Sequence, residues 1–199
     1  MKKISFLIAI SVLMLGAQAQ TKSTPVVSYK VETSKSVVAW KGKKVGGAHN
    51  GKVSIADGSW SMIKGNLKDG SFNIDMNSLT CDDIKDSKSN ADLIGHLKAD
   101  DFFGTSTHPT AKLDILSSKP LGNGKFEVSG NLTIKGISSP TSFKASVVSS
   151  DSKSIKLTSK IIFDRTKYDI KYGSTLFGAA IDKAIEDNVT LDIVLVGSR

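Results

Sequence analysis

The stretch Lys125–Ile137, KFEVSGNLTIKGI, decides the fold. Its apolar side chains fall on one side of an extended chain, and these are Phe126, Val128, Leu132 and Ile134. A period of two over this length predicts a strand with one dry face and one wet face. Strands of a parallel sheet are buried on both faces, so the pattern favours an antiparallel sheet wrapped around an apolar interior.

Similar alternation recurs along most of the chain. It predicts further strands at 26–32, 36–43, 52–56, 71–77, 111–115, 143–147, 155–163 and 189–195. Turn residues separate them, at 46–51, 57–59, 68–70 and 122–124. The predicted fold class is therefore all-β, a single antiparallel up-and-down barrel of about eight strands, because closure removes exposed strand edges. A barrel of this size is either filled by side chains or holds one ligand.

One segment, residues 78–103, interrupts the alternation. It is charged and carries Leu93, Ile94 and Leu97 at helical spacing. We expect a short amphipathic helix at 89–98, with Ser87 or Ser89 as its N-cap. The barrel thus carries a helix-bearing insertion.

The first residues predict export. A basic start, Lys2-Lys3, precedes an apolar run at 4–15 that is too short to span a bilayer, and Ala17-Gln18-Ala19 resembles a cleavage site. We expect a signal peptide at 1–19, one barrel domain at 20–199, and a periplasmic or secreted protein. No other apolar run is long enough for a membrane helix.

Composition argues against several partners and sites. The formal net charge is +8, but the lysines are scattered and aromatic residues make up only 7% of the chain, so a nucleic-acid surface is not expected. The single cysteine, Cys81, predicts no internal disulfide and a small apolar role. Transient contact with a membrane surface and a homodimer stay open as partners.

Neither a metal site nor a catalytic residue is predicted. The three histidines, His49, His96 and His108, lie in different segments without paired spacing, and no nucleophile motif appears. His96 is the one candidate for a polar contact to a ligand headgroup, or else it pins the insertion to the barrel. Arg165 either pairs with an aspartate to hold a turn or, like Tyr168, donates to a headgroup.

Three segments in order resemble the YceI family of exported, lipocalin-like barrel proteins. They are GHLKADDFF at 95–103 with THPT at 107–110, GNLTIKGISSPTSF at 130–143, and FDRTKYDI at 163–170. The resemblance covers essentially the whole chain after residue 19. It implies an extended barrel with an apolar tunnel for a long isoprenoid chain, as in a quinone or polyprenyl lipid, or for a fatty-acid-like amphiphile such as a fatty amide. It implies no cofactor and no catalytic residue.

The first hypothesis is therefore a carrier that holds a long-chain amphiphilic lipid for transport or storage. Gly130 lies on the inward face and would leave space there. The expected ligand contacts are inward-facing residues together with the His96 and Phe102-Phe103 region: Val38, Trp40, Phe72, Ile74, Met76, His96, Phe102, Phe103, Leu113, Ile115, Phe126, Val128, Leu132, Ile134, Phe163, Leu191 and Ile193.

Two other hypotheses remain open from the residues alone. The alternative to a carrier is a non-catalytic structural or interaction module of the cell envelope, with a side-chain-filled barrel and loops at 78–103 that bind a partner. An enzyme acting on a lipid or a small carbonyl compound ranks last, because no nucleophile–base pair stands out in the sequence.

Overall fold

A computed structural model describes residues 24–199, so the predicted signal peptide lies outside the described residues. This part of the chain is built mainly of strands, with one α-helix, α1 (Ser87–Lys98). The strands are β1 (Val26–Val31), β2 (Val37–Lys44), β3 (Gly47–Ile63), β4 (Asn66–Asp75), β5 (Thr110–Gly122), β6 (Lys125–Ile134), β7 (Ile137–Ser150), β8 (Ser154–Asp164) and β9 (Asn188–Ser198). Short 3-10 segments lie at Thr33–Lys35, Met76–Ser78, Arg165–Tyr168, Thr175–Phe177 and Ile181–Lys183.

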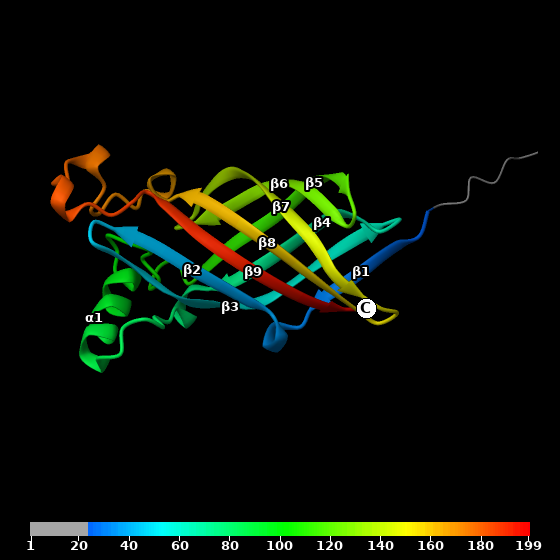
Figure 1. Cartoon of the computed structure of the whole chain (residues 1–199), viewed down its shortest axis with the longest axis horizontal. Coiled ribbons are helices and arrows are strands. Elements are labelled where there is room, and N and C mark those ends of the chain that lie inside the picture. The colour runs from blue at the N-terminus through cyan, green and yellow to red at the C-terminus, as the bar shows by residue number, and fades with distance from the viewer. Residues whose placement is uncertain (1–23) are drawn as a thin grey trace, which may run out of the picture.

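The strands form a closed antiparallel barrel, as predicted. Neighbours follow the order β1-β3-β2-β9-β8-β7-β6-β5-β4, and pairing of β3 with β4 closes an eight-strand ring with β1 as an extra strand. The barrel is elongated, with α1 and the 3-10 segments of residues 165–183 gathered at one end and the C-terminus at the other (Figure 1). We call these the helix end and the C-terminal end.

The extra strand, β1, occupies the part of the wall between β3 and β9 that β2 does not reach. Both β1 and β2 lie between β3 and β9, β2 toward the helix end and β1 toward the C-terminal end. Ser36 bridges the interruption, since its Oγ accepts from Val196 N at 3.0 Å and donates to Glu32 O at 2.9 Å. The two segments therefore act as one broken strand.

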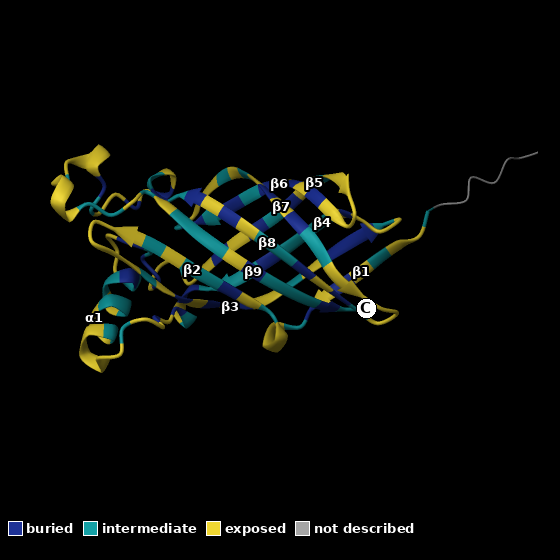
Figure 2. Cartoon of the chain, viewed as in Figure 1, coloured by how far each residue is buried: buried dark blue, intermediate teal, exposed yellow. Residues whose placement is uncertain are grey.

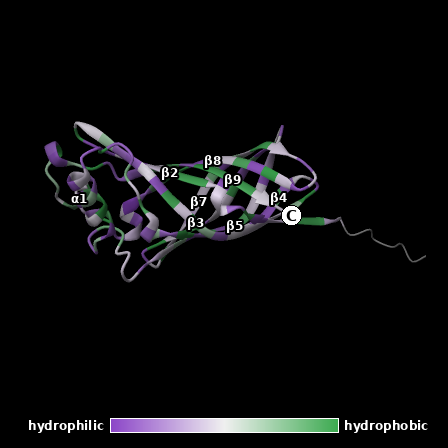
Figure 3. Cartoon of the chain, turned by 90° about the horizontal axis from the view of Figure 1, so that it is seen from below, coloured by the Kyte–Doolittle hydropathy of each residue, from purple (hydrophilic) through white to green (hydrophobic). Residues whose placement is uncertain are grey.

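Burial follows the alternation that predicted the fold. In β6, every second residue from Phe126 to Ile134 is buried, and Val128 is 0% exposed. The colouring by burial and by hydropathy alternates along the strands in the same way (Figures 2 and 3). The core therefore lies inside the barrel.

Three predicted turns were wrong. The segments 57–59 and 68–70 lie inside β3 and β4, and all but the first residue of 46–51 belongs to β3. A Cβ on Gly58 would lie 2.7 Å from Phe72 Cδ1, and one on Gly70 would lie 2.9 Å from Trp60 Cβ, so these glycines permit close packing. The true hairpin turn is Lys64-Gly65, where both residues have positive φ, 51° and 76°.

The helix was predicted correctly, but its start and its cap were wrong. It begins at Ser87, and Asp86 is the N-cap, because Asp86 Oδ1 accepts from Ser89 N at 2.8 Å. Leu97 is buried, and Leu93 and Ile94 pack against the core. None of the helices in residues 24–199 is long and apolar enough to cross a membrane.

Candidate functional site: an apolar cavity

The barrel encloses one continuous apolar cavity. The cavity volume is about 160 Å³. Every strand of the eight-strand ring contributes to the wall. Ligand pockets are mostly apolar and commonly measure about 300–1,000 Å³, so this cavity has the apolar character of a ligand site at a smaller volume.

Most of the residues predicted to contact a ligand lie on this wall. They are Val38, Trp40, Phe72, Ile74, Met76, Phe103, Leu113, Ile115, Leu132, Ile134, Phe163, Leu191 and Ile193. The structure thus brings together side chains from distant parts of the sequence. Their contact with a ligand stays a prediction.

Four predicted contacts lie off the wall. Phe126 and Val128 are inward-facing but are 1% and 0% exposed, enclosed by the surrounding core. His96 and Phe102 lie at the helix end, in an aromatic cluster beside the wall.

Gly130 does not enlarge the cavity, contrary to our expectation. A Cβ at this position would lie 2.2 Å from the Asp114 carbonyl oxygen of β5. The register of β5 and β6 shifts next to this point, between Ile115 and Ser117. Glycine is therefore needed for the close approach of two strands, which is a packing role.

Trp60 fills the C-terminal end of the cavity. Its ring lies 5.5 Å from the Tyr29 ring and 6.1 Å from the Phe72 ring, and its exposed fraction is 2%. A Cβ on Gly197 would lie 2.1 Å from Trp60 Cη2, so Gly197 makes room for the indole. The predicted turn at 57–59 hid this residue, because it separated Trp60 from the strand that carries it.

At the helix end, the wall is made of residues from several elements. Leu79, Leu97 and Phe103 line the cavity there, together with Gly42 and Val189. Phe103, Gly42 and Val189 are half-buried and Leu79 and Leu97 are buried, whereas Trp60 at the other end is 2% exposed.

The aromatic cluster holds His96 in place. The His96 ring lies 5.3 Å from the Phe102 ring and 4.5 Å from the Tyr172 ring, both edge-on. Its Nε2 lies 3.2 Å from Asp101 Oδ2. This environment fits the structural alternative, in which His96 pins the insertion to the barrel, here through its contact with Tyr172. A headgroup contact stays a prediction.

Arg165 has the structural role that we considered. Its guanidinium is 1% exposed and forms an ion pair with Asp187 at 3.1 Å. Five hydrogen bonds use its donors, to Glu186 O, Ile170 O, Tyr172 O, Ile185 O and Asp187 Oδ1. Burial lowers the pKa of Arg165, while Asp187 and Asp164 oppose this shift. With its five donors engaged, Arg165 has none left for a headgroup.

Tyr168 is equally enclosed. Its exposed fraction is 2%, and burial raises the pKa of its phenol. Neither Tyr168 nor Arg165 lies on the cavity wall. The two residues therefore hold the loop at the helix end.

Comparisons with known proteins agree with this geometry. The family model described as "YceI-like domain" matches residues 29–197. A UPF0312 protein of Shewanella denitrificans is 30% identical over 98 residues, 49% of each chain, so the match spans about half the length of that relative. A UPF0312 protein of Vibrio parahaemolyticus is 25% identical over 154 residues, 74% of this chain and 75% of the other.

Solved structures show the same fold at low identity. The crystal structure of BcnA from Burkholderia cenocepacia is 19% identical and aligns with a TM-score of 0.68, over 83% of this chain and 98% of that one. A polyisoprenoid binding domain from Saccharophagus degradans is 17% identical and aligns with a TM-score of 0.61, over 85% and 97%. Taken with the closed barrel and its apolar cavity, the family match shows that this chain belongs to the YceI-like domain family.

Proposed function

We propose that the chain binds a long-chain, isoprenoid-like amphiphile in the barrel cavity and shields it from water. The observation that carries the proposal is one apolar cavity lined by all eight strands of the ring. The likeness to a fold described as a polyisoprenoid binding domain supports the ligand class. A polyprenyl lipid, an isoprenoid quinone and a fatty amide all share the required long hydrocarbon chain.

Apolar burial alone can supply the affinity. Each isoprene unit has five carbons, and its transfer from water gains about 4 kcal/mol at about 0.8 kcal/mol per carbon group. Association and ordering cost about 4–15 kcal/mol, so a few buried units are enough to offset that cost. Such a protein needs no catalytic group, and we propose a binding role without chemistry.

Ligand enters, in this proposal, at the helix end. The wall there includes half-buried residues, while Trp60 closes the C-terminal end. Beside the helix end lies a segment that we call the rim loop, residues 172–185. It attaches to the β2–β3 turn, since Val45 N donates to Ala184 O at 2.9 Å.

The rim loop also offers a means of contact with a membrane. Leu176, Phe177 and Ile181 are 74%, 52% and 81% exposed, an arrangement that is costly in water but favourable in a lipid interface. Lys171 Nζ lies 5.1 Å from the Phe177 ring, which puts a cation beside this apolar group. We propose that the rim loop touches a bilayer while the ligand enters or leaves, and that the exported protein transports or stores the lipid.

The interaction-module hypothesis required a filled barrel. The cavity argues against it, because empty apolar space costs stability unless something occupies it.

Displacement of a fluorescent fatty acid by polyprenols of increasing length tests the proposed function. We expect tighter binding with each added isoprene unit until the cavity is full. Displacement that does not depend on chain length, or no uptake of the fluorescent fatty acid, would contradict the proposal. Transfer from vesicles should slow when Leu176, Phe177 and Ile181 are changed to serine, while affinity for a ligand supplied in detergent stays the same.

A further inference from the structure

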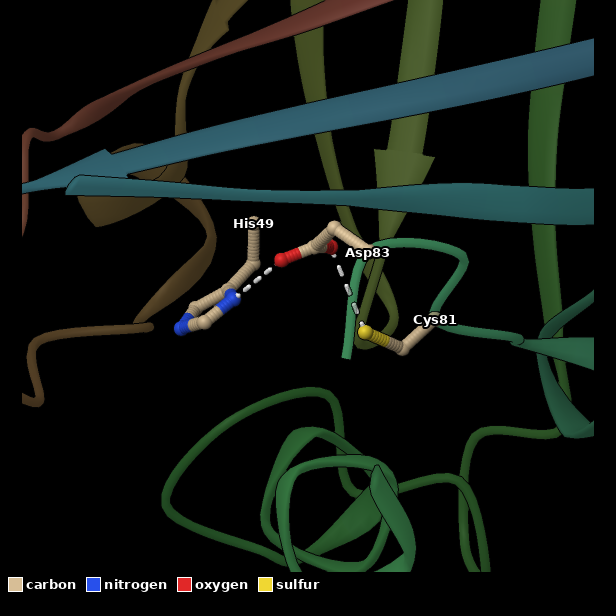
Figure 4. Close-up of side chains that lie close together, drawn as sticks. All are labelled: His49, Cys81 and Asp83. Atoms are coloured by element: carbon tan, nitrogen blue, oxygen red, sulfur yellow. Dashed lines mark hydrogen bonds and ion pairs between the residues drawn. The ribbon is translucent and has the colours of Figure 1, made fainter. Parts of the chain in front are cut away.

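A second group of side chains lies outside the cavity wall. His49 from the start of β3 meets Cys81 and Asp83 from the segment between the 3-10 turn Met76–Ser78 and α1 (Figure 4). His49 Nδ1 lies 2.8 Å from Asp83 Oδ2, and Cys81 Sγ lies 3.4 Å from Asp83 Oδ1. One ligand atom from each residue falls within 4.8 Å of the other two.

The backbone holds this group together. Residues 80–83, which we call the strap, pair with the free side of β3: Thr80 N donates to Lys52 O at 2.9 Å, and Asp82 N donates to Asn50 O at 2.8 Å. A Cβ on Gly51 would lie 1.8 Å from Thr80 O, so glycine is required for the approach. Asn50 N also donates to Asp83 Oδ1 at 2.8 Å, which orients the carboxylate.

The chemistry of the three groups suits a zinc-type ion. Thiolate, imidazole and carboxylate are the side chains that bind Zn²⁺. Bond lengths of about 2.0–2.3 Å in a tetrahedral site put neighbouring ligand atoms about 3.3–3.8 Å apart. The ligand atoms here lie within 4.8 Å of one another, so side-chain adjustments bring them to that spacing. Cys81 is buried, while the side chains of His49 and Asp83 are 27% and 29% exposed, so the group is enclosed on one side and open to solvent on the other.

We propose that His49, Cys81 and Asp83 bind one divalent transition-metal ion of the zinc type, with solvent at the fourth position. The ion displaces two protons to solvent, the one between His49 Nδ1 and Asp83 Oδ2 and the thiol proton that Cys81 donates to Asp83 Oδ1. Sequence spacing does not reveal the site, because β3 and the strap are brought together only by the fold.

Bound metal would fasten the strap to β3. The strap follows Leu79, which lines the cavity, and Trp40 Nε1 donates to Thr80 O at 3.0 Å. A metal here therefore adds a cross-link next to the helix end of the barrel. The site shares no residue with the cavity wall, so its test does not depend on the proposed lipid ligand.

The test uses the purified, reduced and metal-stripped protein. Titration with Co²⁺ should produce a near-ultraviolet thiolate-to-metal band that saturates at one ion per chain, and Zn²⁺ should abolish it. Competition with a chromophoric chelator gives the Zn²⁺ affinity. The conservative variants Cys81→Ser, His49→Gln and Asp83→Asn remove one ligand each.

Cys81→Ser should eliminate the band, and His49→Gln or Asp83→Asn should weaken Zn²⁺ binding at least about 10–100-fold. The matched control is His96→Gln, because His96 pairs with Asp101 at 3.2 Å but belongs to no group of three metal-ligating side chains in residues 24–199. Its Zn²⁺ affinity should equal that of the unaltered protein. The proposal is overturned if the folded, unaltered protein shows no thiolate band, a result that needs no variant, or if Cys81→Ser binds Zn²⁺ equally well.

Discussion

Two cavity-filling substitutions at opposite ends of the barrel give the sharpest prediction. Ala111 and Ala145 both line the cavity and are 5% and 6% exposed. Ala111 pairs with Ile74 near the helix end, and Ala145 pairs with Phe126 toward the C-terminal end. Replacing either alanine with tryptophan fills space that a ligand would otherwise occupy.

The position decides which ligands are affected. A tryptophan at Ala145 shortens the cavity from its closed end by about one isoprene unit. The loss is about 4 kcal/mol of gross burial, or roughly 10²- to 10³-fold in affinity, for chains long enough to reach it. Shorter chains should bind as before. A tryptophan at Ala111 stands near the entrance and should weaken the binding of long and short chains alike.

The assay is displacement of a fluorescent fatty acid by polyprenols of graded length. Lys144→Trp is the matched control, because Lys144 is next to Ala145 on β7 but faces outward and is exposed. It should bind like the unaltered protein. If Ala145→Trp weakened short and long chains equally while Ala111→Trp spared short ones, the direction of entry would be reversed. If neither substitution changed binding, the ligand would lie outside the barrel.

Three further predictions concern stability. Gly197→Ala should cost about 1–3 kcal/mol of unfolding free energy and lower the melting temperature, because the new Cβ would lie 2.1 Å from Trp60 Cη2; an unchanged melting temperature would contradict the packing described at this end. Arg165→Met should lower the free energy of unfolding in urea by about 3–5 kcal/mol, because it leaves Asp187 and four carbonyl groups without their buried partner. A loss below about 1 kcal/mol would refute the structural role of Arg165. The hydrogen bond from Ser61 lowers the pKa of Asp69 below its ordinary value of 3.8. The carboxylate therefore stabilises the fold above pH 3.8, and this contribution is lost as the pH falls through the lowered pKa. Asp69→Asn should lose less stability on acidification than the unaltered protein, and equal losses would count against the linkage.

The barrel could be predicted from the sequence because its signal is local. In β6, five inward positions alternate with outward ones, and the burial that results needs no knowledge of the rest of the chain. Antiparallel pairing and closure follow from the same pattern repeated in the other strands. The helix was also visible, because Leu93, Ile94 and Leu97 lie on one of its faces.

The turns at 57–59 and 68–70 were predicted wrongly because glycine occurs both in turns and where strands pack closely. Gly58 and Gly70 resemble turn residues next to aspartates, yet each sits in a strand where a Cβ would collide with an aromatic residue or its neighbours. Gly130 has the same role toward Asp114. Only the three-dimensional approach of the strands distinguishes a packing glycine from a turn glycine.

The two candidate sites differ in how far the sequence alone predicts them. The cavity wall was largely predicted, because inward-facing positions of a barrel converge on one interior. The group of His49, Cys81 and Asp83 was missed, since 34 residues separate His49 from Asp83 and the strap joins β3 only in the folded chain. Trp60 was missed because Gly58, two residues before it, suggested a turn.

Mass spectrometry of an organic extract tests the central claim most directly. Protein purified without detergent from the cells that produce it should release a long-chain isoprenoid or fatty amphiphile at close to one molecule per chain, and Ala111→Trp purified in parallel should release far less. A folded protein that carries no such lipid, and takes up none when polyprenols are added, would show that the space inside the barrel is not a lipid site.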